Sequence, residues 1–449
     1  MKEIKDLLKK LKPVLGKKAD ALWYSYLAET DLKKKDFDMD IIRIIADKKA
    51  KVNYDPDIVL PPCERAEIKG EYYLGDVFYA GKFYCRFGLR EDEFIKHILI
   101  AGMTGTGKTN TAYQFLIQLK LKDKPFLIFD WKKNYRDLIQ IPLFKALKIY
   151  TVGSKTSPFY FNPLIPPPGT DPKYWLTRLV NVIEHAYFVG HGVEYFLRKA
   201  IDKLYGIFGV YKGSNKYPTF KDVDLIIKRE FARGREMLWL ASAKRVLASL
   251  TFSGSLGDVV NVAEQCSIAD LLNQDVVLEM DCLSDSDKIF FTEALLLWIY
   301  EYRKNEGNRE RFKHAIVIEE AHHVLSHKKE IEKGEETIIE TLLRMIREFG
   351  ESVIVIDQEP SKISDSIKAN TYCKITFNLG NAKDSNDIGR CMNLENEQFR
   401  FIDKLNVGQA IVKLKGRFNV PILCFFPLIG IKKGAVTDEI VRSLLKNPV

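Results

Sequence analysis

The segment Gly102–Thr109 reads G-x-x-x-x-G-K-T, a combination of residue types and spacing that binds phosphate groups. Its glycines let the backbone curl, so that successive N–H groups point at phosphate oxygens. Lys108 would bring a positive charge to the β- and γ-phosphates, and the Thr109 hydroxyl would ligate Mg²⁺. The residues predicted to bind the nucleotide are Thr104, Gly105, Thr106, Gly107, Lys108, Thr109 and Asn110.

The sequence on either side of this loop supplies the context that such a site needs. The apolar run 97–101 precedes it and is typical of a short buried strand, whereas 110–119 has the apolar spacing of a helix. A strand, a glycine-rich loop and a helix in this order indicate a nucleoside triphosphate site. We expect ATP rather than GTP, because the segment 381–384 lacks the spacing of the guanine-reading N-K-x-D motif.

A second apolar run, 314–318, ends in two adjacent carboxylates, Glu319 and Glu320. Glu319 would hold Mg²⁺ through water, and Glu320 would orient or deprotonate the attacking water. The alternative is a solvated acidic pair at a strand end. We expect His322 to orient Glu320 or a backbone group rather than bind zinc, because the H-E-x-x-H pattern is absent. The two motifs together predict an ATP-hydrolysing site that uses ATP and Mg²⁺.

The elements that must position these residues follow from the pattern of apolar segments. From residue 95 onward strand-like and helix-like segments alternate, which predicts an α/β fold with a mostly parallel sheet and helices on both faces. A long stretch from about 170 to 272 has helical periodicity and is interpreted as an insertion packed beside the nucleotide core. The predicted strands are 97–101, 125–130, 275–280, 314–319, 352–357, 373–379, 408–414 and 420–426.

Two regions of different character precede the core. Residues 1 to about 50 are predicted to be helical, and the first eighteen contain seven lysines. This region is either a solvated amphipathic helix packed on the body or an arm that binds DNA or a partner. Residues 66–90 hold three short aromatic segments separated by Gly75 and Gly81, which predicts a small β-meander, and 53–57 with Pro61-Pro62 indicates a linker.

These patterns divide the chain into five predicted regions. They are a lysine-rich helical region at 1–60, a short β-strand region at 61–94, the first part of a P-loop ATPase core at 95–168, a helical insertion at 169–273 and the second part of the core at 274–449.

Composition narrows the class of protein. The chain has 449 residues, 46% of them hydrophobic and 29% charged, as is usual for a soluble globular protein of more than one structural unit. We find no uncharged run long enough to cross a bilayer and no secretory signal. The seven cysteines form no C-x-x-C pair, which favours reduced thiols in the cytoplasm. The net charge of +9 fits a polyanionic partner but is weak support for DNA by itself.

Five blocks in a fixed order make the sequence resemble the HerA/FtsK group of hexameric DNA-translocating ATPases, and most closely archaeal HerA-like proteins. The blocks are Gly102–Thr109, Phe129–Asp137, Glu319–His322, Arg344–Ser361 and Leu405–Val412. The resemblance covers about 95 to 427. It implies a RecA-like P-loop NTPase core, ATP hydrolysis coupled to DNA translocation or helicase activity, and assembly into a homo-oligomer, expected to be a hexamer.

The resemblance also assigns roles to individual residues. Gln358 matches the family's polar sensor of the γ-phosphate, and its amide can donate to phosphate or to the lytic water. An arginine from the vicinity of Arg344 and Arg347 would reach the neighbouring subunit's nucleotide, and Arg347 is favoured; the alternative is two exposed helix arginines. The family usually has Asp where this chain has Glu319. A nuclease partner is known for the family, but the β-barrel on which it docks is longer than the strands expected at 66–90.

A motor that acts on any DNA must grip phosphates rather than read bases. The candidate DNA contacts are Lys132, Lys133, Lys362 and Lys368. The segment 130–133 ends the second predicted strand, so its charges could face a phosphate or the central channel, or equally belong to a solvated loop.

The function favoured by these observations is a ring ATPase that moves DNA. One alternative keeps the motor and changes its task to packaging or transfer of plasmid or viral DNA. Another is an ATP-driven protein remodeller or nucleotide-dependent switch that never acts on DNA. A small-molecule kinase is the weakest reading, because the acidic pair and Gln358 suit attack by water better than transfer to an acceptor.

Overall fold

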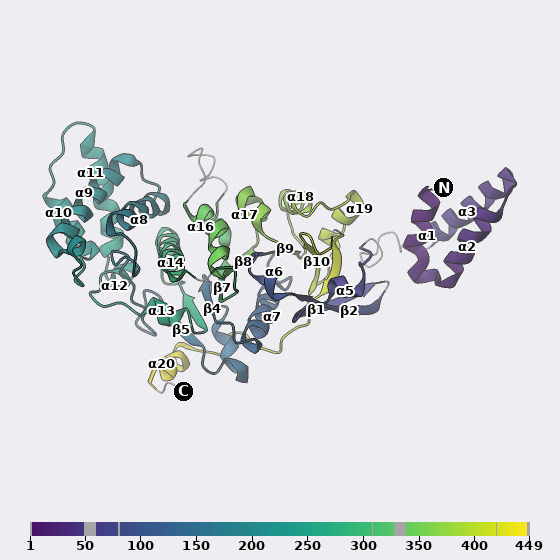
Figure 1. Ribbon diagram of the computed structural model, residues 1–449, viewed down its shortest axis with the longest axis horizontal. Helices are drawn as coiled ribbons and strands as arrows, with labels where there is room; N and C mark the ends of the chain where they lie inside the picture. The colour runs from purple at the N-terminus through teal and green to yellow at the C-terminus, as the bar shows by residue number, and fades with distance from the viewer. Residues whose placement is uncertain are drawn as a thin grey trace.

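A single mixed sheet of eleven strands forms the centre of the part of the chain that the computed structural model describes, residues 2–48, 60–79, 81–307, 309–326, 338–418 and 420–446 (Figure 1). The strand order is β2-β1-β11-β10-β9-β3-β8-β7-β4-β6-β5. The strands are β1 (Tyr72–Tyr79), β2 (Lys82–Leu89), β3 (Ile98–Ala101), β4 (Phe126–Asp130), β5 (Lys148–Thr151), β6 (Val276–Glu279), β7 (His314–Glu319), β8 (Glu351–Asp357), β9 (Cys373–Thr376), β10 (Gln409–Leu414) and β11 (Ile422–Phe425).

The middle of the sheet is parallel, as predicted. From β9 through β3, β8, β7, β4 and β6 to β5 every neighbouring pair is parallel, whereas β10, β11, β1 and β2 join as antiparallel strands. All eight predicted strand segments contain a strand of this sheet. The edge strand β5 was not predicted, because a four-residue segment with alternating burial gives little periodic signal.

Successive side chains of each strand point to opposite faces of the sheet, and this divides the core into two layers. Ile98 and Ile100 of β3 pack with the helix α7 (Lys108–Leu121), whereas Leu99 points to the opposite face and belongs to the cluster that contains the long helix α14 (Asp285–Glu306). The helices α16 (Ile338–Ile346), α17 (Asp365–Asn370) and α18 (Ala382–Cys391) lie on the same side as α14 (Figure 1). Strands buried on both faces must be apolar throughout, which is why they were recognisable.

The predicted helical insertion lies between β5 and β6. Its helices are α8 (Pro172–Ala186), α9 (His191–Phe208), α10 (Phe220–Arg229), α11 (Glu236–Thr251), α12 (Leu256–Val260) and α13 (Ile268–Leu271). The first begins with Pro172 in its first turn and is capped by the Asp171 carboxylate, which accepts the Tyr174 N–H at 2.9 Å. The insertion shares one apolar cluster with α14, so it extends the core rather than forming a separate one.

The N-terminal residues form α1 (Lys2–Leu15), α2 (Lys17–Ala28) and α3 (Leu32–Lys48), which pack around Ile4, Leu8, Tyr26 and Ile42. The predicted linker at 53–57 lies outside the described residues. The remaining helices are the short α5 (Arg65–Ile68), α6 (Glu91–Phe94) and α19 (Asn396–Phe399), and the C-terminal α20 (Asp438–Lys446). Within the described ranges, no helix combines the length and the apolar character needed to span a membrane.

The predicted three-stranded meander is wrong: residues 72–89 form a two-stranded hairpin that pairs with β11 and so belongs to the central sheet. Gly75 does not separate two strands but lies inside β1. A Cβ there would stand 2.7 Å from the Phe425 carbonyl oxygen. The glycine therefore permits two backbones to approach closely. In the sequence, a glycine with this role looks the same as a glycine in a turn.

His97 is buried where β3 begins, with a positive φ of 61°. Its Nδ1 accepts the Val353 N–H at 3.0 Å, and its Nε2 lies 2.5 Å from the Leu343 carbonyl oxygen, to which it donates. This arrangement requires the neutral ring, and burial lowers the pKa of His97 to about 4.

We predict that the free energy of unfolding falls as the pH drops below 6.5, because His97 binds a proton more readily in the unfolded state than in the folded state. At roughly 1.4 kcal/mol per pH unit, the contribution of His97 should shrink by about 2 kcal/mol between pH 6.5 and 5. Denaturant midpoints measured across this range check the prediction. In His97→Asn, whose side chain tolerates positive φ and does not titrate, the decline should be smaller. Identical pH profiles for the two proteins would contradict the assignment.

Candidate functional site

The carboxyl ends of the central parallel strands meet at one pocket of about 320 Å³. β3 leads into the phosphate loop, β7 ends at Glu319 and β8 ends at Asp357. The structure brings most predicted nucleotide and catalytic residues to this pocket, and both Thr109 and Glu319 line it. The predicted residues in its wall are Thr104, Gly105, Gly107, Lys108, Thr109, Asn110, Lys132, Glu319, Glu320 and Gln358. Thr106 is not in the wall; its hydroxyl donates to the Met103 carbonyl oxygen at 2.8 Å.

The phosphate loop has the shape that its glycines permit. Gly105 and Gly107 have φ of 83° and 122°, and α7 starts directly after Gly107. The Lys108 ammonium donates to the carbonyl oxygens of Gly102 and Met103 at 2.6 and 2.9 Å. Burial lowers the pKa of Lys108 to about 8, against the opposing effect of nearby carboxylates. The loop thus carries a cation that a phosphate group would stabilise.

Glu319 is buried and held by two side chains from the loop after β4. The Tyr135 hydroxyl donates to its Oε1 at 2.9 Å, and the Asn134 amide donates to its Oε2 at 3.1 Å. Burial, followed by the charge of Asp130, raises the pKa of Glu319 to about 8. Tyr135 and Asn134 were not predicted as site residues. They stand in the block 129–137 that carried the resemblance, which was the only signal available.

Asp130 shapes that loop from below. It is fully buried and accepts the backbone N–H groups of Lys132 and Tyr135, each at 3.0 Å. The sequence left open whether 130–133 faces a phosphate or solvent. The structure divides the segment: the Asp130 carboxylate turns inward as a loop anchor, while Lys132 reaches the pocket.

Glu320 lies at the centre of a chain of polar contacts across the pocket. The Lys132 ammonium donates to its Oε1 at 2.5 Å, and the Gln358 amide donates to the same oxygen. The Gln358 carbonyl oxygen in turn accepts from the Thr104 hydroxyl at 2.5 Å. The backbone of Glu320 is left-handed, with φ of 49°, which is costly for a residue with a side chain. The predicted base and sensor therefore contact each other directly.

The side chain of His322, predicted to orient Glu320 or a backbone group, instead contacts the Asp357 carboxylate. Its Nδ1 lies 3.0 Å from Asp357 Oδ2 and 3.9 Å from Glu320 Oε2, and its backbone N–H donates to Asp357 at 2.7 Å. Although burial alone would lower the pKa of His322, contact with Asp357 outweighs burial and raises it. Asp357, which also lines the pocket, was missed because nothing in the sequence distinguishes it from the end of an apolar strand.

The C-terminal segment 427–438, here called the strap, forms another wall. Its Pro427 carbonyl accepts from Asn110 at 2.9 Å, and Ile429 N–H donates to Asn110 at 2.9 Å. Leu428, Ile429, Ile431 and Lys433 line the pocket. The predicted phosphate-loop residue Asn110 therefore fixes the strap.

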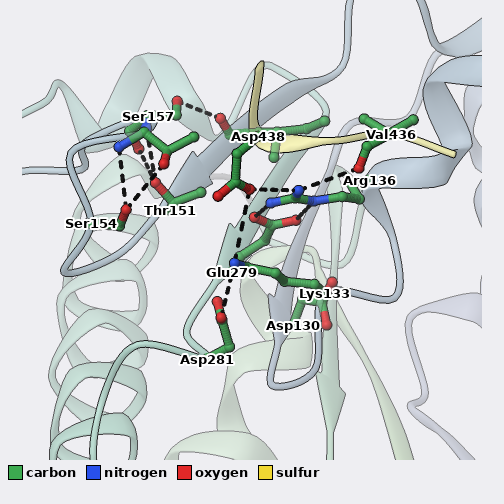
Figure 2. Close-up of polar contacts among 12 residues, drawn as sticks. Asp130, Lys133, Arg136, Thr151, Ser154, Ser157, Glu279, Asp281, Val436 and Asp438 are labelled. Carbon is green, nitrogen blue, oxygen red and sulfur yellow. Dashed lines mark hydrogen bonds and ion pairs between the residues drawn. The ribbon is translucent and has the colours of Figure 1, made fainter. Parts of the chain in front are cut away.

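Arg136 anchors the far end of the strap (Figure 2). Its guanidinium donates to Glu279 at 2.6 and 2.5 Å, to Asp438 at 2.8 Å and to the Val436 carbonyl at 3.3 Å. Lys133, predicted to contact DNA, lies in the same network with its ammonium 2.9 Å from Asp281 (Figure 2). The network ties β6, the loop after β4 and α20 together.

The other predicted residues lie outside the pocket. Arg344 in α16 and Arg347 just after it have exposed side chains. Lys362 is paired with Glu359 at 2.6 Å. Lys368 is only 4% exposed and pairs with Asp387 at 2.6 Å, a placement that does not suit the predicted DNA contact.

Arg136→Met should destabilise the protein by about 3–5 kcal/mol, because it leaves the Glu279 carboxylate buried without its cation. Adding Glu279→Gln should restore part of this loss, since the orphaned charge is then gone. Chemical denaturation of the two variants and of the parent protein gives their free energies of unfolding, which can then be compared. A double variant no more stable than Arg136→Met would show that the ion pair is not the source of the loss.

Comparisons with known proteins agree with this architecture. Residues 79–164 match the family described as the central domain of helicase HerA. VirB4 of Thermoanaerobacter pseudethanolicus superposes with a TM-score of 0.61 at 15% identity, covering 80% of this chain and 96% of that one. The bacterial conjugative coupling protein TrwB in an unbound form gives 0.57 at 13% identity, covering 81% and 90%.

TrwB has also been solved as a plasmid coupling protein in complex with ADP and Mg²⁺, and that structure gives a TM-score of 0.57 at 13% identity, covering 80% of this chain and 90% of that one. No curated protein matches the sequence. The predicted fold is confirmed, because the chain shares the RecA-like P-loop fold of VirB4 and TrwB. The predicted resemblance to HerA is supported over residues 79–164, which match the HerA central domain.

Proposed function

We propose that this protein is an ATP-hydrolysing ring motor that translocates DNA. The observation that carries the proposal is the pocket in which the phosphate loop, the acidic pair and Gln358 meet. Substrate positioning and charge stabilisation are the main tasks in phosphoryl transfer to water, and this pocket holds the groups for both. The match to the HerA central domain supports the same reading.

Mg²⁺ fits the donor set of this pocket. Thr109 offers a hydroxyl and Glu319 a carboxylate, both oxygen ligands of the kind Mg²⁺ prefers. The buried Glu319 carboxylate is held by two neutral donors, Tyr135 and Asn134, and a metal would supply the positive charge that they do not. When bound, Mg²⁺ would neutralise charge on the β- and γ-phosphates. TrwB, which shares the fold, binds ADP with Mg²⁺.

The protein groups would then divide the work. Lys108 leaves the loop carbonyls to hold phosphate oxygens, and the γ-phosphate competes for the amide of Gln358. Loss of that contact and of the Lys132 ion pair leaves the Glu320 carboxylate able to take a proton from water. Lys132 is thus placed to hold Glu320 in the nucleotide-free state, a role that the sequence alone did not suggest.

Assembly and partner follow from the residues outside the pocket. Arg344 and Arg347 are exposed and lie away from the pocket of their own chain, which suits action on a neighbouring subunit's nucleotide. We infer a homo-hexamer with DNA in its channel, gripped through phosphates. Among the four predicted lysines, Lys362 is the most accessible of those outside the pocket. All seven cysteines are free, consistent with a cytoplasmic location, and a nuclease partner rests on the resemblance alone.

A second candidate is a DNA transfer motor of the plasmid type. The observation that favours it is the extent of the structural similarity, which spans at least 90% of VirB4 and of the conjugative coupling protein TrwB. Both candidates share the pocket and the DNA partner. The alternative from another functional class is an ATP-driven protein remodeller that does not act on DNA.

Duplex DNA should raise the ATPase rate at least several-fold at low salt, because occupied phosphate contacts bias the ring toward its hydrolytic arrangement. The assay titrates blunt, tailed and closed circular duplexes, with Lys108→Ala as the inactive reference.

Glu320→Gln should still bind ATP yet lose about 10²-fold or more of the ATPase rate, since the base is gone while the phosphate loop is intact. An unchanged rate at every DNA concentration favours the remodeller, and full turnover in Glu320→Gln moves the base elsewhere.

Rings that mix Arg347→Ala with Lys108→Ala subunits should recover activity that neither variant shows alone. In such rings some interfaces combine an intact phosphate loop from one subunit with an intact Arg347 from its neighbour. ATPase assays over a series of mixing ratios measure the effect, and Arg344→Ala, in the preceding helix α16, provides the matched comparison. Rates that stay at the level of the inactive parents for every ratio would exclude Arg347 as the shared residue.

A further inference from the structure

A second pocket of about 900 Å³ is lined by residues of the strands β9 and β10 and the helices α17 and α18. Figure 1 shows where these elements lie. The second pocket is separate from the nucleotide pocket. β9 runs parallel to β3, with Cys373 opposite Ile98 and Thr376 opposite Ala101. The phosphate loop follows the carboxyl end of β3, whereas Tyr372 and Lys374 line the second pocket at the amino end of β9. The two pockets therefore lie toward opposite ends of the same strands.

The wall of this pocket holds two lysines in an unfavourable arrangement. Lys374 of β9 and Lys413 of β10 are directly paired across the antiparallel ladder. Like charges in directly opposed cross-strand positions are destabilising, and a chance surface feature would not bury one of them. Lys374 is only 7% exposed, and its ammonium donates to the Thr371 carbonyl oxygen at 2.6 Å.

The acidic residues of the pocket do not offset these charges. Asp365 and Asp387 both contact Lys368, at 2.9 and 2.6 Å. Among the described residues, none places a carboxylate within ion-pair distance of Lys374, Lys413, Lys415 or Arg390, all of which line the pocket. Four cations thus share a cavity without an acidic partner.

Burial also affects the two paired lysines. Burial lowers the pKa of Lys374, and burial also lowers that of Lys413. A buried ammonium without a counter-ion is costly unless an anion joins it. Lys368 of the neighbouring helix α17 has such counter-ions, Asp365 and Asp387.

We propose that this second pocket binds a phosphate group, held by Lys374, Lys413, Lys415 and Arg390. Phosphate matches the site because its several acceptor oxygens can accept from more than one of the cations that line the pocket. A free polyphosphate or a backbone phosphate of nucleic acid carries the same chemistry. The site adds a second anion-binding position to the chain and does not depend on the proposed motor activity.

The test uses the full chain with Lys108→Ala, so that the phosphate loop contributes little to the signal. Calorimetry with inorganic pyrophosphate forms one arm, and fluorescence anisotropy with labelled duplex DNA forms the other, both at low salt. Lys374→Met and Lys413→Gln are each added to this background. The exposed Lys122 at the end of α7, on the other layer of the core, gives the control Lys122→Met.

We expect each pocket substitution to weaken binding about tenfold or more in at least one arm, with Lys122→Met unchanged. Weakening in the pyrophosphate arm identifies a free phosphate ligand, whereas weakening with DNA alone identifies backbone phosphate. Loss of a repulsive pair should also leave the melting temperature equal or higher, which separates lost binding from lost folding. Affinities in both arms that match those of the Lys122→Met control would overturn the proposal, whether or not DNA stimulates ATP hydrolysis.

Discussion

The arrangement of the nucleotide pocket depends on three buried carboxylates, Asp130, Glu319 and Asp357, at the ends of adjacent strands. A buried carboxylate is costly unless donors satisfy it, so the loops that follow these strands must fold back onto them. Asp130 captures two backbone N–H groups of its own loop, which places Asn134 and Tyr135 on Glu319. Asp357 likewise captures the segment that follows Glu320. The loops that form the site are thus positioned by satisfying these acids.

The charges of the nucleotide pocket are individually unfavourable, and together they complement a metal-bound triphosphate. Burial raises the pKa of Glu319 to about 8 and lowers that of Lys108 to about 8. Each group would gain from an opposite charge in direct contact, because the carboxylates near Lys108 offset only part of the effect of burial. Lys108 meets carbonyl oxygens and Glu319 meets neutral donors. A ligand that brings anionic oxygens to one and a cation to the other would stabilise both, as the nucleotide and Mg²⁺ of the proposed function would.

The sequence predicted those features that depend on local pattern and missed those that depend on distant partners. Apolar runs located the strands, and the phosphate loop was recognisable because its context is contiguous. Asn134 and Tyr135 contact a residue 185 and 184 positions away, and the strap reaches Asn110 from 317 positions away. The periodic spacing of apolar residues does not indicate contacts between residues so far apart in the sequence. The role of Gly75 was wrongly predicted for a related reason. This position needs a glycine because the Phe425 carbonyl oxygen of another strand lies against it.

The contacts of Glu320 connect this geometry to control of hydrolysis. Its left-handed backbone is held by the sheet on one side and by η4 (Ala321–His323) on the other, so the carboxylate has a fixed origin. Lys132 and Gln358 share one oxygen of that carboxylate, and Thr104 of the phosphate loop holds Gln358. On the proposed function, a γ-phosphate at the loop would meet Thr104 and Gln358 before Glu320. Its arrival would then free the Glu320 carboxylate, so that the proposed base would act on water only when the substrate is bound.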